Sequence, residues 1–263
     1  MPQACIPRSD DSWVMTHTTP RELVETLTLN PRLVDGDDER FTGYGVMGVP
    51  YADGRYLALR DMLATSIGPA YRTLWHRTPA GRWTIFTNTA PELSCPRYFG
   101  AATATEQVPA IDTAWLDDWT LQVSMGDRFS WRIVLQASPA TRMMTAMAQA
   151  MPESAWDNDV VLGAMGPMAG GFLGIGRTRL HGFTPNGQSF KAAPLQVWRV
   201  VGGEAQLDGV QLGELGPLPH QDALGDFWLP QRGLFFAGRA RFSVGTSNRR
   251  SDQSTSGSRS GSR

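Results

Sequence analysis

Lysine, cysteine and histidine are scarce in this sequence of 263 residues, and each shortage narrows the available chemistry. Lys191 is the only lysine, so Schiff-base chemistry has a single candidate residue. The two cysteines, Cys5 and Cys95, form no CxxC pair, and the four histidines are far apart in the sequence. We therefore expect no metal, no cofactor and no disulfide framework, and a reducing cytoplasm is the simplest location.

Net charge is also low. The formal charge is −1, and the part expected to fold shows no cluster of basic residues, so we expect no nucleic-acid partner. The first residues lack the basic and apolar segments of a signal peptide. The longest uncharged run, 160–176, contains Pro167 and several glycines, which favours a buried helix and loop over a membrane span.

Composition divides the chain into three parts. Residues 1–20 are predicted to form an extended lead, and residues 21–245 a single β-rich domain. Residues 246–263, rich in Ser, Arg and Gly, are predicted to be a disordered tail. The sequence does not indicate an oligomeric state.

Short alternating runs separated by turn residues dominate the central part. The run 119–125 alternates apolar and polar residues, and Gly126-Asp127 connects it to a second such run at 129–136. A Thr-Pro-Ala-Gly turn likewise connects 71–77 to 82–88. Both patterns predict β-hairpins. Further strands are expected at 41–49, 55–61, 108–114, 177–183, 189–192, 196–201, 204–207 and 233–244.

Two helical regions interrupt the strands. Pro20 to about Leu29 is predicted to form a short helix, with proline in its first turn. A helical insertion is expected near 139–170, where Ser138-Pro139 gives an N-cap signal and a methionine stripe follows. A second helix should cover about 156–165, and segment 212–231 should be a long surface connection.

The fold class is therefore mainly β (α+β by content), an antiparallel β-barrel or two-sheet sandwich with a helical insertion. Large barrels hold small apolar ligands in an interior that side chains do not fill. This architecture is similar to that of lipocalin-like β-barrels, including relatives of carotenoid hydratases. The chain contains no motif of theirs, so no site residue is assigned from them.

A glycine motif at Gly43, Gly45 and Gly48 matches the GxGxxG pattern of dinucleotide sites. That pattern binds a pyrophosphate only where a helix begins directly after it. Here Pro50-Tyr51 follows, so we interpret the glycines as part of a twisted or bulged strand.

The first candidate site is the loop from Asn88 to Gly100, which carries many reactive side chains behind a predicted strand. We predict Glu92 and Tyr98 as catalytic residues, with Tyr98 as the general acid. Arg97 is a candidate for holding a carboxylate or carbonyl oxygen of the substrate. Trp75, from the nearby hairpin, is a candidate apolar wall. A connecting loop in which Glu92 and Arg97 simply pair would explain the same residues.

The second candidate site is the segment from Asp222 to Gly233. We predict Asp226 as catalytic, Trp228 as an apolar wall and Arg232 as a second anchor for an anionic group. In the structural alternative, Asp226 caps a turn and pairs with Arg232 on the surface.

The predicted function is binding of an apolar small molecule in a β-barrel interior. Cofactor-free acid–base chemistry of the hydratase, isomerase or cyclase type is left open, and so is whether the chain is an enzyme. The alternative is a non-catalytic protein–protein interaction module with a fully packed β-sandwich.

Overall fold

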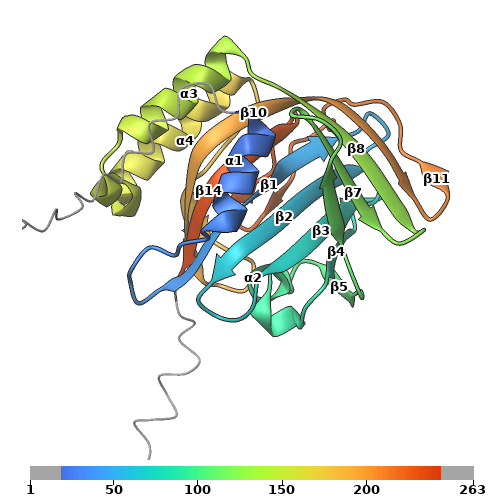
Figure 1. Cartoon of the computed structure of the whole chain (residues 1–263), viewed down its shortest axis with the longest axis horizontal. Coiled ribbons are helices and arrows are strands. Elements are labelled where there is room, and N and C mark those ends of the chain that lie inside the picture. Colours follow the sequence, from blue (N-terminus) through green and yellow to red (C-terminus); the bar gives the residue numbers. More distant parts are fainter. Residues whose placement is uncertain (1–18, 244–263) are drawn as a thin grey trace, which may run out of the picture.

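The computed structural model describes residues 19–243, so the predicted lead and tail lie almost wholly outside the described residues (Figure 1). Within this range a large sheet is accompanied by helices on both of its faces. The helical elements are α1 (Pro20–Leu29), η1 (Pro91–Leu93), α2 (Pro96–Phe99), α3 (Pro139–Ala150), η2 (Glu153–Asp157) and α4 (Asp159–Leu173). The strands are β1 (Glu39–Pro50), β2 (Tyr56–Thr65), β3 (Tyr71–Arg77), β4 (Trp83–Thr87), β5 (Ala104–Gln107), β6 (Asp112–Trp115), β7 (Thr120–Met125), β8 (Phe129–Gln136), β9 (His181–Phe183), β10 (Ser189–Leu207), β11 (Val210–Gln211), β12 (Ala223–Leu224), β13 (Phe227–Trp228) and β14 (Leu234–Phe242).

Most strands join one sheet in the order β5-β4-β3-β2-β1-β14-β10-β8-β7-β6. All neighbours along this path are antiparallel except β4 and β5, so the sheet is mixed. The prediction of a mainly β chain with a helical insertion is confirmed. No closed barrel is found in residues 19–243, because β5 and β6 end the sheet without pairing to each other.

The sheet curls around a packed apolar core on its concave side (Figure 1). Strands far apart in the sheet, such as β3 and β7, contribute side chains to the same cluster, and α1 adds Leu23, Val24 and Leu27. Trp131, Tyr51 and Phe129 are at most 1% exposed there. The prediction of a hollow interior is therefore wrong, because large aromatic side chains fill the inside of the curl.

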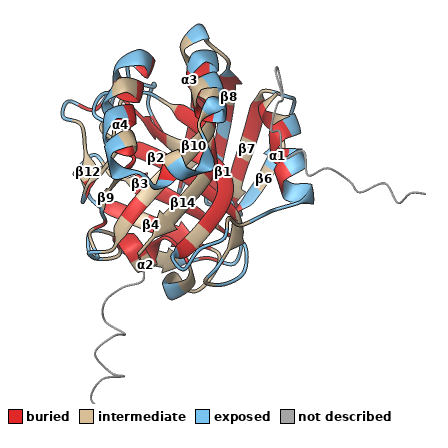
Figure 2. Ribbon diagram, turned by 90° about the vertical axis from the view of Figure 1, so that its left-hand side faces the viewer, coloured by how far each residue is buried: buried red, intermediate tan, exposed pale blue. Residues whose placement is uncertain are grey.

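The opposite face of the same strands carries a second buried layer. Figure 2 shows buried strand segments in red behind α3 and α4. Side chains alternate between the faces of a strand, so β2 places Leu57 and Leu59 in the concave core and Tyr56 and Ala58 in the second layer. Helix α2 and the β12–β13 hairpin cover this layer, while α3 and α4 pack next to it against β10 and β14.

Local sequence signals placed several elements correctly. Helix α1 begins with a capping box between Thr19 and Glu22, and α3 begins with the predicted Ser138 cap. The two predicted hairpins form as β3–β4 and β7–β8. No helix in residues 19–243 is long and apolar enough to cross a bilayer.

The second inserted helix is longer than predicted, because α4 continues through Pro167 and its glycines to Leu173. A Cβ at Gly166 would lie 2.6 Å from the Thr178 carbonyl oxygen, and one at Gly170 would lie 2.2 Å from that of Gly176. The glycines therefore allow the following chain to pack closely against the helix, and this tertiary contact outweighs their poor helix propensity.

Other boundaries also differ from the prediction. Only the last part of the predicted strand 108–114 is confirmed: β5 ends before it and β6 begins at Asp112. Residues 108–111 lie outside the strands, and Pro109 among them has no N–H for a ladder. The three strands predicted within 189–207 form one strand, β10, and Pro194 lies at a register shift within it. The glycines of the GxGxxG motif lie in β1, beside a second register shift near Met47.

Candidate functional site

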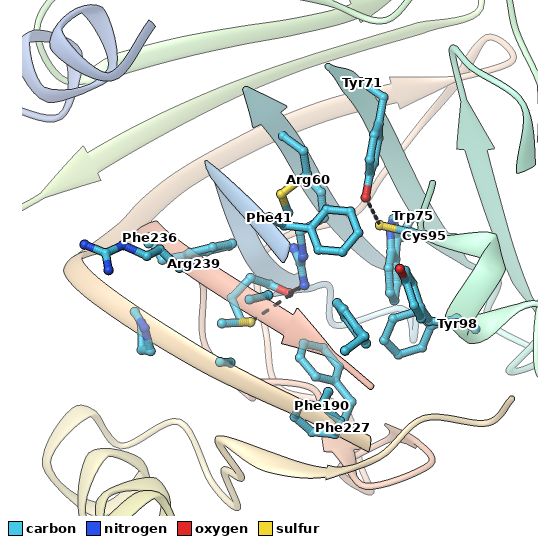
Figure 3. A pocket seen from close by; sticks show the side chains of 18 residues that line it. Phe41, Arg60, Tyr71, Trp75, Cys95, Tyr98, Phe190, Phe227, Phe236 and Arg239 are labelled. Carbon is cyan, nitrogen blue, oxygen red and sulfur yellow. Dashed lines mark hydrogen bonds between the residues drawn. The ribbon is translucent and has the colours of Figure 1, made fainter. Parts of the chain in front are cut away.

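A cavity of about 70 Å³ lies on the second face of the sheet, between the two predicted loop clusters (Figure 3). We call it the aromatic pocket. Its walls come from β1, β2, β3, the α2 segment, β10, β13 and β14. The lining residues are Phe41, Met47, Arg60, Met62, Tyr71, Trp75, Cys95, Tyr98, Phe99, Phe190, Ala192, Pro194, Phe227, Phe236, Gly238, Arg239, Ala240 and Phe242.

The lining is buried on one side and half-buried on the other. Arg60, Trp75 and Cys95, from β2, β3 and the loop before α2, are at most 6% exposed. Phe227 and Phe236, on the opposite wall, are only partly buried. The pocket therefore has a closed floor against β2 and β3, and its β13–β14 side lies nearer to solvent.

Arg60 is the central polar residue of the pocket. Its side chain extends from β2 into the pocket (Figure 3), and its guanidinium carbon lies 5.2 Å from the Trp75 ring centroid and 5.4 Å from that of Phe236. Its Nη1 donates to the Val46 carbonyl oxygen at 2.6 Å, and its Nη2 donates to that of Met47 at 3.3 Å. Arg60 thus satisfies carbonyl groups where the register of β1 shifts.

Cys95 lies on the pocket wall within a short chain of hydrogen bonds. Trp75 Nε1 donates to Thr73 Oγ1 at 3.0 Å, and Thr73 Oγ1 donates to Cys95 Sγ at 3.4 Å. The Tyr71 hydroxyl lies 3.6 Å from the same sulfur, as a dashed line in Figure 3 shows. Burial raises the pKa of the Cys95 thiol, so the thiol is neutral near neutral pH.

Tyr98 lines the pocket, and its hydroxyl is hydrogen-bonded to Glu39, which is not part of the lining. The hydroxyl donates to Glu39 Oε2 at 2.5 Å, and Arg97 donates to both oxygens of the same carboxylate at 2.9 and 2.5 Å. Burial and this carboxylate raise the pKa of Tyr98. Although burial acts in the opposite direction, the bonds from Arg97 and Tyr98 lower the pKa of Glu39.

The remaining residues of the first cluster divide between pocket and surface. Trp75 lines the pocket and is 1% exposed. Glu92 is exposed and does not line it. Arg97 pairs with Glu39 rather than with Glu92, and only the backbone oxygen of Glu92 accepts from it, at 3.4 Å.

The residues predicted from the second cluster lie outside the pocket. Asp226 pairs with Arg179 and accepts from the backbone N–H of Phe183 at 3.0 Å, which ties the β12–β13 hairpin to β9. The guanidinium carbon of Arg177 lies over the Trp228 ring, 5.0 Å from the ring centroid. Arg232 is exposed. Roles of Glu92, Asp226, Trp228 and Arg232 in binding or catalysis stay predictions.

Sequence analysis missed Arg60, although a signal for it was present. Tyr56, Ala58, Arg60 and Met62 alternate along β2 and share one face, so an arginine stands on an otherwise apolar face. Phe227, next to the predicted Trp228, does line the pocket. No group of three or more side chains that could hold a metal occurs within residues 19–243.

Comparisons with known proteins add little to this description. No family model matches the sequence, and no curated protein matches it. Among solved structures, the chain is similar to an acetoacetate decarboxylase from Legionella pneumophila subsp. pneumophila str. Philadelphia 1. The two are 11% identical, the match covers 92% of this chain and 95% of that chain, and the TM-score is 0.32. A likeness of this size assigns no chemistry to the chain.

Proposed function

We propose that this protein binds an apolar small molecule in the aromatic pocket. The supporting observation is a cavity lined by aromatic and aliphatic side chains around a single buried charged group, Arg60, which is the usual composition of a ligand site. A fully packed interaction module, the alternative from the sequence, would have no reason to keep this space empty.

The volume limits the ligand to a small molecule. A cavity of about 70 Å³ corresponds to roughly five to seven water-sized groups, since one water needs about 10–15 Å³ by the same measure. The ligand should therefore be a short-chain or single-ring compound, much smaller than a carotenoid.

Binding without turnover is what the contacts favour. Of the predicted catalytic residues only Tyr98 lines the pocket, and its proton is held by Glu39. A phenol with a raised pKa is a weak general acid near neutral pH. Hydration, isomerisation or cyclisation through Tyr98 therefore remains the second hypothesis.

Methyl NMR tests the binding proposal. Met47 and Met62 line the pocket, so protein labelled with ¹³C in the methionine methyl groups should show saturable shifts of these two signals during titration with toluene. Met47→Leu and Met62→Leu assign the signals.

A blocking variant gives the control. Ala192→Phe adds a ring to the pocket wall and should abolish the shifts, because the cavity holds only a few heavy atoms. Ala114→Phe places the same ring on an exposed position of β6 and should leave them unchanged. Methyl signals that do not respond in the wild type, or that respond equally in Ala192→Phe, would refute binding in this pocket.

A further inference from the structure

Arg60 is a buried charge without an acidic partner. It is 5% exposed, and no carboxylate of residues 19–243 forms an ion pair with it. The second arginine of the pocket differs, because Arg239 Nη1 pairs with Glu153 at 2.6 Å. A buried guanidinium without a counter-ion is costly, and proteins normally pair such a group.

The neighbouring polar groups do not supply the missing negative charge. Cys95 and Tyr71 line the pocket and would become negatively charged if they lost a proton, but burial raises the pKa of both. They are therefore neutral near neutral pH. Backbone carbonyls and the Met47 sulfur accept the hydrogen bonds of Arg60, and these groups carry no net charge.

The guanidinium is also held in a fixed position. Nη1 donates to Val46 and Leu59 oxygens at 2.6 and 2.9 Å, and the Trp75, Phe227 and Phe236 rings surround the group. Nε of Arg60 has no hydrogen-bond acceptor in the described part of the chain. A fixed cation with a free donor in an apolar space is suited to bind an anion with little loss of entropy.

We propose that the aromatic pocket selects the anion of a small apolar carboxylic acid, whose carboxylate binds Arg60 and whose hydrocarbon part packs against Phe227 and Phe236. The inference rests on the proposed function and names its ligand class. A carboxylate fits the inference because it would neutralise the buried guanidinium and accept from its unused N–H. The cavity volume limits the acid to about five to seven non-hydrogen atoms.

Three probes of matched shape test the charge requirement. These are 3-methylbutanoate, its neutral amide 3-methylbutanamide, and the cation of 3-methylbutan-1-amine. Isothermal titration at neutral pH should show the anion binding about 10- to 100-fold more tightly than the amide, as expected for charge-assisted hydrogen bonds. The cation should not bind measurably, because it would face Arg60 at close range.

Two arginine variants show whether Arg60 carries the preference. Arg60→Met keeps an unbranched apolar side chain and should reduce the anion-to-amide ratio to about one, since no other unpaired cation lies in the pocket wall within residues 19–243. Arg239→Met also removes a positive charge from the lining, but one already paired with Glu153, and should leave the ratio within about threefold of wild type. Circular dichroism and thermal unfolding serve as controls for the folding of both variants.

The outcomes separate this inference from the proposed function. Equal or weaker binding of the anion than the amide by the wild type overturns it, even if Arg60→Met fails to fold. A preference that survives in folded Arg60→Met overturns it as well. If toluene and the amide bind but the anion does not, the apolar pocket stands and only its charge selectivity is refuted. If no probe binds, both proposals fail.

Discussion

Removing the Tyr98 hydroxyl should destabilise the protein by an amount that depends on pH. Tyr98→Phe deletes one donor to Glu39, a carboxylate whose side chain is 9% exposed, and leaves the two bonds from Arg97. A hydrogen bond to a charged group contributes about 1.5–3 kcal/mol. Because Arg97 continues to compensate the carboxylate, we expect the lower part of this range, about 2 kcal/mol at neutral pH.

The sign of the pH effect follows from Glu39. Its pKa lies below the ordinary value of 4.5 in the folded protein, so this carboxylate stabilises the fold fully above that value. The stabilisation is lost as the pH falls through the lowered pKa. Below it, Glu39 is neutral and the bond from Tyr98 resembles an ordinary one, so the cost of Tyr98→Phe should fall to about 1 kcal/mol.

Urea unfolding at neutral and acidic pH, followed by tryptophan fluorescence, measures this cost. Tyr56→Phe is the matched control: its buried hydroxyl donates to the Pro230 carbonyl oxygen at 2.8 Å, an acceptor that does not titrate in this range. Its cost should be about 1 kcal/mol at every pH. The reasoning is refuted if Tyr98→Phe costs the same at both pH values, or no more than Tyr56→Phe at neutral pH.

Two further predictions concern the edge of the core and the pocket thiol. Thr19→Ala removes the side-chain half of the α1 capping box, the bond that Thr19 Oγ1 accepts from the Glu22 N–H, and should lower the free energy of unfolding by about 1 kcal/mol in the same urea assay. Thr19→Ser keeps this hydroxyl and should therefore lose much less stability. In a Cys5→Ser background, Cys95 should react slowly with methyl methanethiosulfonate, because it is 6% exposed and burial raises its pKa. Saturating toluene should slow this reaction further, measured by mass spectrometry, and an unchanged rate would show that the thiol does not share the ligand's space.

Local signals in the sequence predicted much of the fold. Glycine turns predicted the β3–β4 and β7–β8 hairpins, Pro20 predicted the start of α1 and the Ser138 cap predicted that of α3, because these features depend on neighbours along the chain. The curl of the sheet depends on pairing between distant strands. The sequence therefore indicated an apolar space but placed it on the wrong face.

The site was less predictable for the same reason. Tyr98 and Trp75 were among the candidates and do line the pocket, yet residues that complete its lining, such as Phe190 and Phe236, are remote from them in the sequence. Glu39 bonds to Tyr98 across 59 positions and lies at the end of an acidic stretch that is typical of a solvated turn. Alternation along β2 indicates that Arg60 stands on an apolar face, but its lack of an acidic partner depends on how distant residues fold together, since even the adjacent Asp61 pairs with Arg72.

Within the described residues, the open sheet ends in two unpaired strand edges. Its two terminal strands, β5 and β6, are four residues long each. An unpaired edge strand can form hydrogen bonds with a strand of another chain, and a short edge strand offers few backbone donors and acceptors for this pairing. The chain can therefore leave its curved sheet unclosed with little risk of aggregation through these margins. Both faces of β1–β3 then carry buried side chains, one face in the concave core and the other at the aromatic pocket.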